Sequence, residues 1–337
     1  MKTIAAEAKM DGGRLVPLLL PAEESEGLGL CNPSVLIENN RILINLRKVN
    51  YALWHSERDR QFFSRWGPLT YLHPEDDQHL RTTNYLLDLD RHTFQMNAWS
   101  KIDTSHKDVD PLWEFVGLED GRLVKWDGVI HLLGVRRDVD TIGTGRMEYS
   151  TLHVPLDLND GVSEIVRARI PAPGADDSYC EKNWMPVLTK PHTFIKWTSP
   201  TEVVETEVFA GGSTVTKHLR PGLDIPFDLR GGSQVVPWGN FYIAIVHHVD
   251  LTKNYLDQKD AVYRHRFAVW DSEFNLLGIS TEPLSFLGGD IEFCAGAGKL
   301  DGNLLVTFGF QDNAAFLLEI PGRTVDIYIE DALSYVA

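Results

Sequence analysis

Charged and amide side chains recur at matching places along the sequence, and their types are those that bind hydroxyl groups and transfer protons. One set stands just before an apolar run, and a second set stands just after the next apolar run. The first set is Asn32, Glu119, Asp120, Arg122, Glu181, Lys182, Asn183, Ser233 and Glu292. The second set is Arg47, Arg136, Arg137, His247, His248, Gln311 and Asp312. Carboxyl groups can transfer protons, while guanidinium, ammonium and amide groups donate hydrogen bonds to oxygen atoms.

The apolar runs beside these residues have the period of β-strands. Five segments each contain an apolar strand, a two- or three-residue polar turn, and a second apolar strand. These hairpins lie at residues 34–46, 123–133, 185–197, 234–246 and 298–308. A further strand pair follows each hairpin, at residues 84–96, 147–166, 202–216, 266–279 and 315–328. The pattern therefore predicts five four-stranded antiparallel units.

A four-stranded antiparallel sheet repeated radially is a propeller blade, so we predict an all-β, five-bladed β-propeller around a central channel. We expect residues 1–337 to form this single domain, with an insertion at about residues 51–83. An ordinary pair of β-sandwiches is the alternative. In a propeller the innermost strands line the channel, so both sets of polar residues would reach one pocket. Such a pocket suits a ligand rich in hydroxyl groups, such as a sugar.

Each of these residues also has an ordinary structural role. Asp120 and Arg122 together would form an ion pair at the start of a strand. Side chains alternate along a strand, so only one ring of His247 and His248 can face the channel. The tryptophans that could stack on sugar rings, with blade packing as the expected role, are Trp54, Trp66, Trp113, Trp184 and Trp197. The recurrence in five units carries more weight than any single residue.

Composition excludes several classes of protein. The chain is 43% hydrophobic and 10% aromatic, enough for a large core, so it is not generally disordered. It has 32 basic and 48 acidic residues, and the net charge of −16 would repel nucleic acid. No apolar run reaches the roughly 18 residues of a membrane helix, and the first ten residues lack a secretory pattern. We therefore expect a cytoplasmic protein without a nucleic-acid or membrane partner.

The sequence gives no support for a metal site or a disulfide framework. Cys31, Cys180 and Cys294 are odd in number and far apart, so we expect buried thiols. The aspartate pairs at 138 and 140 and at 176 and 177 lack ligand spacing, and solvated loop charge is the better interpretation. We expect no metal and no cofactor.

Five short motifs, in order, make the sequence similar to glycoside hydrolase family 130, which contains β-mannoside phosphorylases and related mannosidases. The motifs are Asn32-Pro33-Ser34 with Arg47, Gly117-Leu118-Glu119-Asp120-Gly121-Arg122, Glu181-Lys182-Asn183, Gly231-Gly232-Ser233 with His247, and Glu292 with Gly309-Phe310-Gln311-Asp312. They span roughly residues 30 to 320. Gly121 and His248 depart from the family, where a proline and a glycine are usual. Arg136 and Arg137 are not in clear register with its phosphate-binding arginines, so the resemblance is that of a distant relative.

The resemblance implies a five-bladed propeller that cleaves β-mannosides with inversion. Asp120 would be the general acid and would pass its proton to the glycosidic oxygen through the 3-hydroxyl of mannose. Inorganic phosphate, the co-substrate, would attack from the opposite face and release mannose 1-phosphate. Substrate-binding residues on this interpretation are Asn32, Arg47, Glu119, Arg122, Arg136, Arg137, Lys182, Asn183, His247, Glu292 and Asp312. Those proposed to bind phosphate or hydroxyl groups are Arg47, Arg136, Arg137, Lys182 and His247.

An acid that works near neutral pH needs an elevated pKa. Adjacent Glu119 would raise the pKa of Asp120 if both carboxylates share the pocket. Neighbouring side chains point to opposite sides of a regular strand, so this sharing requires a β-bulge or loop at that point.

Three reactions stay open under the resemblance: phosphorolysis, hydrolysis, and transfer of mannose from a nucleotide sugar. A catalytically silent sugar-binding propeller is the alternative from another class. The expected partners are small molecules, an oligosaccharide or a sugar phosphate. We expect residues 326–337 to close the last blade; contact with a second copy, in a homo-oligomer, is the other use of this tail.

Overall fold

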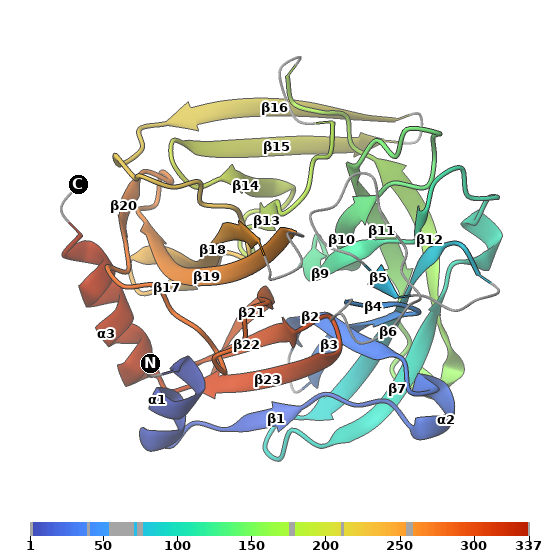
Figure 1. Ribbon diagram of the computed structural model, residues 1–337, viewed down its shortest axis with the longest axis horizontal. Helices are drawn as coiled ribbons and strands as arrows, with labels where there is room; N and C mark the ends of the chain where they lie inside the picture. Colours follow the sequence, from blue (N-terminus) through green and yellow to red (C-terminus); the bar gives the residue numbers. More distant parts are fainter. Residues whose placement is uncertain are drawn as a thin grey trace.

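The computed structural model describes residues 3–38, 41–53, 71–72, 77–174, 179–209, 212–253 and 259–335. The regular structure is nearly all β-strand, and antiparallel pairing groups most strands into five four-stranded units (Figure 1). We number these units sheets 1 to 5 in chain order. Strands β7 and β12 pair in parallel, which joins sheets 1 and 2 into one larger sheet. Within the described residues, no helix is long and apolar enough to cross a membrane.

In sheets 1 to 4 the four strands pair in chain order, while sheet 5 pairs β21, β22 and β23 in chain order and then β1. Sheet 1 contains β2 (Gly29–Glu38), β3 (Arg41–Val49), β6 (Leu80–Asp90) and β7 (Met96–Asp103). Sheet 2 contains β9 (Glu119–Trp126), β10 (Val129–Arg136), β11 (Arg146–His153) and β12 (Val162–Arg169). Sheet 3 contains β13 (Met185–Pro186), β14 (Thr193–Trp197), β15 (Thr201–Phe209) and β16 (Gly212–Arg220). Sheet 4 contains β17 (Val236–Trp238), β18 (Phe241–Lys253), β19 (Lys259–Trp270) and β20 (Leu276–Ile279). Sheet 5 contains β21 (Glu292–Leu300), β22 (Asn303–Phe310), β23 (Ala314–Ile320) and β1 (Leu15–Pro17).

Smaller elements complete the described chain. Two short strands pair with each other, β4 (Ala52–Leu53) and β5 (Tyr71–Leu72). Strand β8 (Phe115–Val116) runs parallel to β6. The helices are α1 (Ile4–Met10), α2 (Ala22–Ser25) and α3 (Gly322–Leu333), with single 3-10 turns at Ser105–Lys107 and Leu158–Asp160. Of the expected insertion, residues 54–70 and 73–76 lie outside the described residues, and so do Trp54, Trp66, Asp176 and Asp177.

The five predicted hairpins are confirmed, and their turns show why they form. Asp127 and Gly128 have φ values of 51° and 81°, and Asp301 and Gly302 have 49° and 86°. Two successive residues in the left-handed region make the tight turn that matches the twist of paired strands, and Asp-Gly is a preferred sequence for it. The predicted strand at residues 93–96 was wrong except for Met96, where β7 begins.

The fourth strand of sheet 5 comes from the opposite end of the chain. The sequence pattern predicts this strand at residues 325–328, but these residues lie in α3. Val325, Ile329 and Ala332 are buried at the spacing of a helix. The prediction therefore assumed the two-residue period of a strand, whereas the 3.6-residue period of a helix applies. Strand β1 pairs with β23 instead, with Leu15 opposite Leu318. The tail therefore does not supply the closing strand: α3 packs on β19, β20 and β22.

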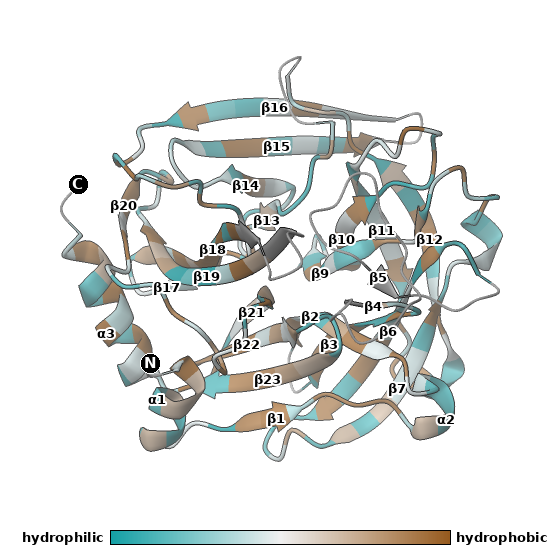
Figure 2. Ribbon diagram, in the orientation of Figure 1, coloured by the Kyte–Doolittle hydropathy of each residue, from teal (hydrophilic) through white to brown (hydrophobic). Residues whose placement is uncertain are grey.

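An apolar core lies between every two neighbouring sheets, including the first and the last. Figure 2 shows hydrophobic residues recurring along the strands of all five sheets. Burying each such face against its neighbour is the main driving force that holds the sheets together. Representative buried residues are Leu43 with Leu123 (sheets 1 and 2), Leu133 with Phe194 (2 and 3), Ile195 with Val246 (3 and 4), Phe267 with Phe308 (4 and 5), and Leu317 with Ile44 (5 and 1).

A buried glutamine ties the innermost segments of four sheets together. Gln234, just before β17, donates from Nε2 to the carbonyl oxygens of Val35 (2.7 Å) and Leu123 (2.9 Å). Its Oε1 accepts from the backbone N–H of Ala297 at 2.7 Å. A fully bonded buried amide is favourable, while an unbonded one is costly, so this side chain fixes the relative placement of β2, β9 and β21.

Candidate active site

Glu119 and Asp120 face the same way because the start of β9 is bulged. The register of β9 against β10 shifts between Leu133 and Val135, and Asp120 has a φ of 50°, in the left-handed region. Gly134 lies opposite, where a Cβ atom would be only 2.5 Å from the carbonyl oxygen of Glu119. The β-bulge that the shared orientation requires is therefore confirmed.

The guanidinium of Arg47 lies at the centre of the site. Arg47 ends a buried stretch of β3 and is only 3% exposed. Its Nη1 donates to Oδ1 of Asp120 at 2.9 Å, and its Nη2 lies 3.5 Å from Oε2 of Glu119. Asn32 donates from Nδ2 to the same Oδ1 at 2.8 Å. Asn32 sits at a matching register shift in β2, with a φ of 44°.

Two further residues hold Arg47, and the sequence pattern did not indicate them. Nη2 donates to the hydroxyl of Tyr51 at 2.7 Å, and Nε donates to Oγ1 of Thr82 at 3.0 Å. Tyr51 follows the hairpin and Thr82 is the third residue of β6, so neither stands at a recurring position. The guanidinium is therefore fixed from three sides, which keeps it aimed at Asp120.

The structure corrects the expected pKa of Asp120. Burial opposes ionisation, but Arg47 and the hydrogen bond from Asn32 outweigh it, so the pKa of Asp120 is lowered. The carboxyl groups with raised pKa values are its neighbours. Burial raises the pKa of Glu119 against the opposing charge of Arg47. Burial, together with the charges of Asp120 and Glu119, raises the pKa of Asp312 to about 6.

Asp312 and Lys182 belong to the same cluster as Asp120. Asp312 follows β22 with a φ of 49°, and its charge interacts with Asp120, Glu119 and Arg47. Lys182 is exposed, and its charge lowers the pKa of Asp120 and opposes the rise at Asp312. Asn183, beside it, is buried with a φ of 62°. Left-handed backbone at Asn32, Asp120, Asn183 and Asp312 is strain of the kind that collects at functional sites.

His247 and His248 face opposite sides, as the alternation along a strand predicts. The ring of His247 stacks on Tyr263, with centroids 5.3 Å apart, and burial lowers its pKa well below the ordinary value. His248 stacks instead on Phe227, with centroids 4.4 Å apart. Tyr263 is a site residue that the sequence pattern did not indicate: burial and the charges of Asp312 and Asp120 raise its pKa to about 12. It lies on β19, which the repeat pattern assigned to the outer strand pair.

Arg122 has a structural role at the start of the strand, as the alternative interpretation predicted. Its hydrogen bonds go to backbone oxygens instead of to the Asp120 carboxylate. Its Nη1 donates to the backbone oxygen of Asp120 at 2.7 Å, and its Nε donates to that of Gly232 at 2.9 Å. It therefore supports the strained bulge from behind and joins it to sheet 4.

Three other expected site residues are engaged elsewhere. Nε of Arg136 donates to Oε2 of Glu148 at 2.9 Å, so this guanidinium is paired within sheet 2. Arg137 donates to the oxygen of Gly143 at 3.2 Å, although its charge still acts on Glu119. The carboxylate of Glu292 accepts backbone hydrogen bonds across residues 286–289, at 2.6 to 3.0 Å, and thereby fixes that loop. Glu292 and Arg136 therefore do not join Asp120.

Several polar atoms of the site have no hydrogen-bond partner among the described residues: Asn32 Oδ1, Glu119 Oε1, Arg122 Nη2 and His247 Nδ1. Buried polar atoms are rarely left unpaired, so their gathering at one place is a mark of a binding site. Across the described parts of the chain, no cluster of three or more His, Cys, Asp or Glu residues could hold a metal ion.

Replacing Asp312 with Asn should stabilise the protein at pH 8. The folded state holds the Asp312 proton more tightly than the unfolded chain, because its pKa is about 6 instead of 3.8. Its stabilising contribution is therefore present below about pH 4 and is lost as the pH rises to 6. Thermal melts should show a higher Tm for Asp312→Asn at pH 8 and no difference at pH 4. A Tm gap that stays constant from pH 4 to 8 would contradict the raised pKa. Asp301→Asn, in an exposed turn with the same φ of 49°, is the control.

No family model matches the sequence, and no curated protein is similar to it. Solved structures are similar in fold. A β-1,2-mannobiose phosphorylase from Listeria innocua has a TM-score of 0.53 at 12% identity, covering 94% of this chain and 96% of that one. A second structure is from the GH130 family of mannoside phosphorylases, which contains glycoside hydrolases that target β-1,2 mannosidic linkages in Candida mannan. Its TM-score is 0.54 at 11% identity, covering 88% of this chain and 85% of that one. A glycosyl hydrolase from Bacteroides ovatus has a TM-score of 0.54 at 10% identity, covering 88% of this chain and 85% of that one.

At these identities the likeness establishes the fold. The structural neighbours of the chain are GH130 mannoside phosphorylases and related proteins, and the low identity is that of a distant relative. The resemblance indicated by the five sequence motifs is therefore confirmed at the level of structure.

Proposed function

We propose that the chain is a carbohydrate-active enzyme, an inverting mannoside phosphorylase that forms mannose 1-phosphate from β-mannosides. The observation that carries this proposal is the Asp120 carboxylate, fixed by Arg47 and Asn32 beside two carboxyl groups of raised pKa. The fold shared with a mannobiose phosphorylase supports it. The protein would be cytoplasmic and would use inorganic phosphate and no cofactor.

The proposal includes a five-bladed propeller formed by residues 1–337 as one domain. Sheets 1 to 5 would be its blades, and β1 would close the ring by completing the last blade. The shared apolar cores support this arrangement, because sheets 5 and 1 are packed together like every other neighbouring pair. A ring of this kind removes most exposed sheet edges.

Without a ligand the site favours the ionised form of Asp120, which cannot donate a proton. Phosphate binding would favour its protonated form. The Asp120 pKa is low because the positive charge of Arg47 is directed at it. A phosphate dianion bound near Arg47 and Lys182 would offset that charge, and the pKa of Asp120 would rise. Phosphate would thus be both the nucleophile and the switch that prepares the acid.

The proton and the bonds then balance. Asp120 gives its proton, through the 3-hydroxyl of mannose, to the glycosidic oxygen as the bond from that oxygen to the anomeric carbon breaks. A phosphate oxygen forms the new bond to the anomeric carbon from the opposite face. The proton carried by monohydrogen phosphate replaces the one that Asp120 lost. The products are mannose 1-phosphate and the shortened sugar.

Hydrolysis is the second candidate, favoured by the direction of Arg136. That guanidinium pairs with Glu148 and Asp138 and so is not among the cations near Asp120. Fewer cations weaken phosphate binding, and water would then take its place as nucleophile.

Incubation with a panel of β-linked mannobioses, with and without inorganic phosphate, tests the proposal. We expect mannose 1-phosphate, and only when phosphate is present. Free mannose in equal amounts under both conditions would indicate a hydrolase, and product only from GDP-mannose would indicate a transferase. Binding of mannobiose without any turnover would indicate a sugar-binding protein. Each of these three results would overturn the phosphorylase assignment.

A further inference from the structure

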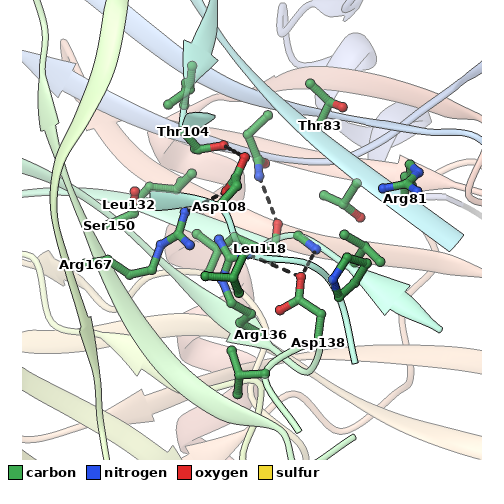
Figure 3. Close-up of a pocket in the computed structure, with 18 of the residues that line it drawn as sticks. Arg81, Thr83, Thr104, Asp108, Leu118, Leu132, Arg136, Asp138, Ser150 and Arg167 are labelled. Carbon is green, nitrogen blue, oxygen red and sulfur yellow. Dashed lines mark hydrogen bonds and ion pairs between the residues drawn. The ribbon is translucent and has the colours of Figure 1, made fainter. Parts of the chain in front are cut away.

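A cavity of about 250 Å³ lies between sheets 1 and 2 (Figure 3). Strands β6 and β7 line it on one side, and β10, β11 and β12 line it on the other. The polar residues that line it are Arg81, Thr82, Thr83, Asn84, Lys101, Thr104, Asp108, Arg136, Asp138, Ser150 and Arg167. This volume is slightly smaller than the roughly 300–1,000 Å³ of pockets that bind drug-sized ligands, so the cavity suits a single small ring.

The guanidinium groups around this cavity are all paired with carboxylates, Arg81 with Asp77 among them. Arg136 pairs with Glu148 at 2.9 Å. Arg167 pairs with Glu164 at 2.6 Å and with Asp108 at 3.1 Å. Guanidinium groups that already have carboxylate partners offer little net attraction to an anion. The cavity therefore favours a neutral ligand over a phosphate or a sulfate.

One buried acceptor in the cavity wall is unused. Asp138 is 5% exposed, and its Oδ2 accepts from the backbone N–H of Gly117 at 2.9 Å and lies 3.4 Å from Nη1 of Arg136. Its Oδ1 has no hydrogen-bond partner among the described residues. An unpaired buried carboxylate oxygen is costly, and only a donor satisfies it. A hydroxyl group is such a donor, whereas a phosphate dianion carries a single O–H together with two negative charges that the carboxylate repels.

The rest of the lining offers hydroxyl groups in reach of a small ligand. Figure 3 shows Thr83, Thr104 and Ser150 on different sides of the cavity, with Arg136 and Asp138 below. Hydroxyls both donate and accept, so they match a ring that carries hydroxyl groups in several directions. The apolar side chains of Leu118 and Leu132 complete the wall.

The cavity also shares its wall with the Asp120 site. Thr82, which holds Nε of Arg47, lines the cavity. Asn84 donates to the backbone oxygen of Leu118 at 2.9 Å, and Leu118 directly precedes Glu119. A ligand in the cavity would therefore touch the residues that position the candidate catalytic carboxylates.

We propose that this cavity is a second ligand site for a neutral, hydroxyl-rich ring of about one hexose in size, with Asp138 Oδ1 as an acceptor. The site goes beyond the proposed function, because binding here requires no reaction at Asp120. The ring has two sources, a free monosaccharide or one remote unit of an oligosaccharide.

Filling the cavity tests this proposal. Ser150→Leu and Thr83→Phe each add bulk to a different wall, so one of them serves if the other fails to fold. Isothermal titration with D-mannose and D-glucose should show one fewer binding event, or at least a tenfold weaker one, in both folded variants. Thr214→Phe, on the exposed strand β16, is the control for Thr83→Phe and should bind as the wild type does. Equal binding by wild type and filled variants would overturn the proposal, as would binding of inorganic phosphate that the wild type shows and both filled variants lose.

A series of mannosides of increasing length separates the two sources. If the ring is a remote unit, affinity should rise at one chain length, and Ser150→Leu should lose that rise while its affinity for mannobiose is unchanged. If the ring is a free monosaccharide, the loss appears with mannose itself. Both readouts measure binding, so they remain informative even if the protein turns over no mannoside.

Discussion

Replacing Asp120 with Asn should reduce turnover of a β-mannoside by about 10³-fold, within the roughly 10²–10⁴-fold that a positioned acid or base contributes. The amide keeps the shape of the carboxylate, and its oxygen can still accept from Asn32 and Arg47. Asn also tolerates the left-handed φ of 50° better than most residues do. The fold and the sugar affinity should therefore persist while the transferable proton is lost.

Asp127→Asn is the matched control for this substitution. Asp127 lies in the turn at the far end of the same β9–β10 hairpin and has a φ of 51°. The Asp127→Asn protein should turn over the substrate at the wild-type rate. Steady-state kinetics on the three proteins, with thermal melts to establish folding, gives the answer. Full activity in a folded Asp120→Asn protein would remove Asp120 from the chemistry.

The placement of the site could be predicted because its residues stand at strand ends that recur along the chain. Asn32, Arg47, Lys182 and Asp312 are far apart in sequence, and the repeat alone indicates that they meet Asp120. The bulge was also predictable, because two adjacent carboxyl groups cannot otherwise share a pocket. These inferences needed only strand period and hairpin geometry.

Other features depend on tertiary contacts that no local pattern records. Tyr51 and Tyr263 reach the site from segments outside the recurring positions. Arg136 stands where the repeat predicts a site residue, but Glu148 on the neighbouring strand gives it a closer partner. The low pKa of Asp120 likewise depends on where the Arg47 guanidinium points, which its sequence neighbours do not determine.

Replacing Arg47 with Met should destabilise the protein by about 3–5 kcal/mol, the typical cost of removing one partner from a buried ion pair. The substitution leaves Asp120 and Glu119 in a buried place without their cation, and it leaves Tyr51 and Thr82 without their donor. Activity should fall as well, because Arg47 positions the Asp120 carboxylate. Urea denaturation measures the change in the free energy of unfolding.

The loss of stability in the Arg47→Met protein should also depend on pH, and the direction of this dependence identifies its cause. In the wild type the pKa of Asp120 is lowered, so its contribution to stability is present above its ordinary pKa and disappears as the pH falls. Without Arg47, burial raises the pKa values of all three carboxyl groups, so stability is lost as the pH rises. The gap between the proteins should therefore be larger at pH 8 than at pH 5. Arg41→Met, at the other end of β3, removes a partly exposed pair with Asp88 and should cost about 1 kcal/mol or less at both pH values. A gap for Arg47→Met that is small, or equal at pH 5 and pH 8, would show that this guanidinium does not hold the carboxylates in place.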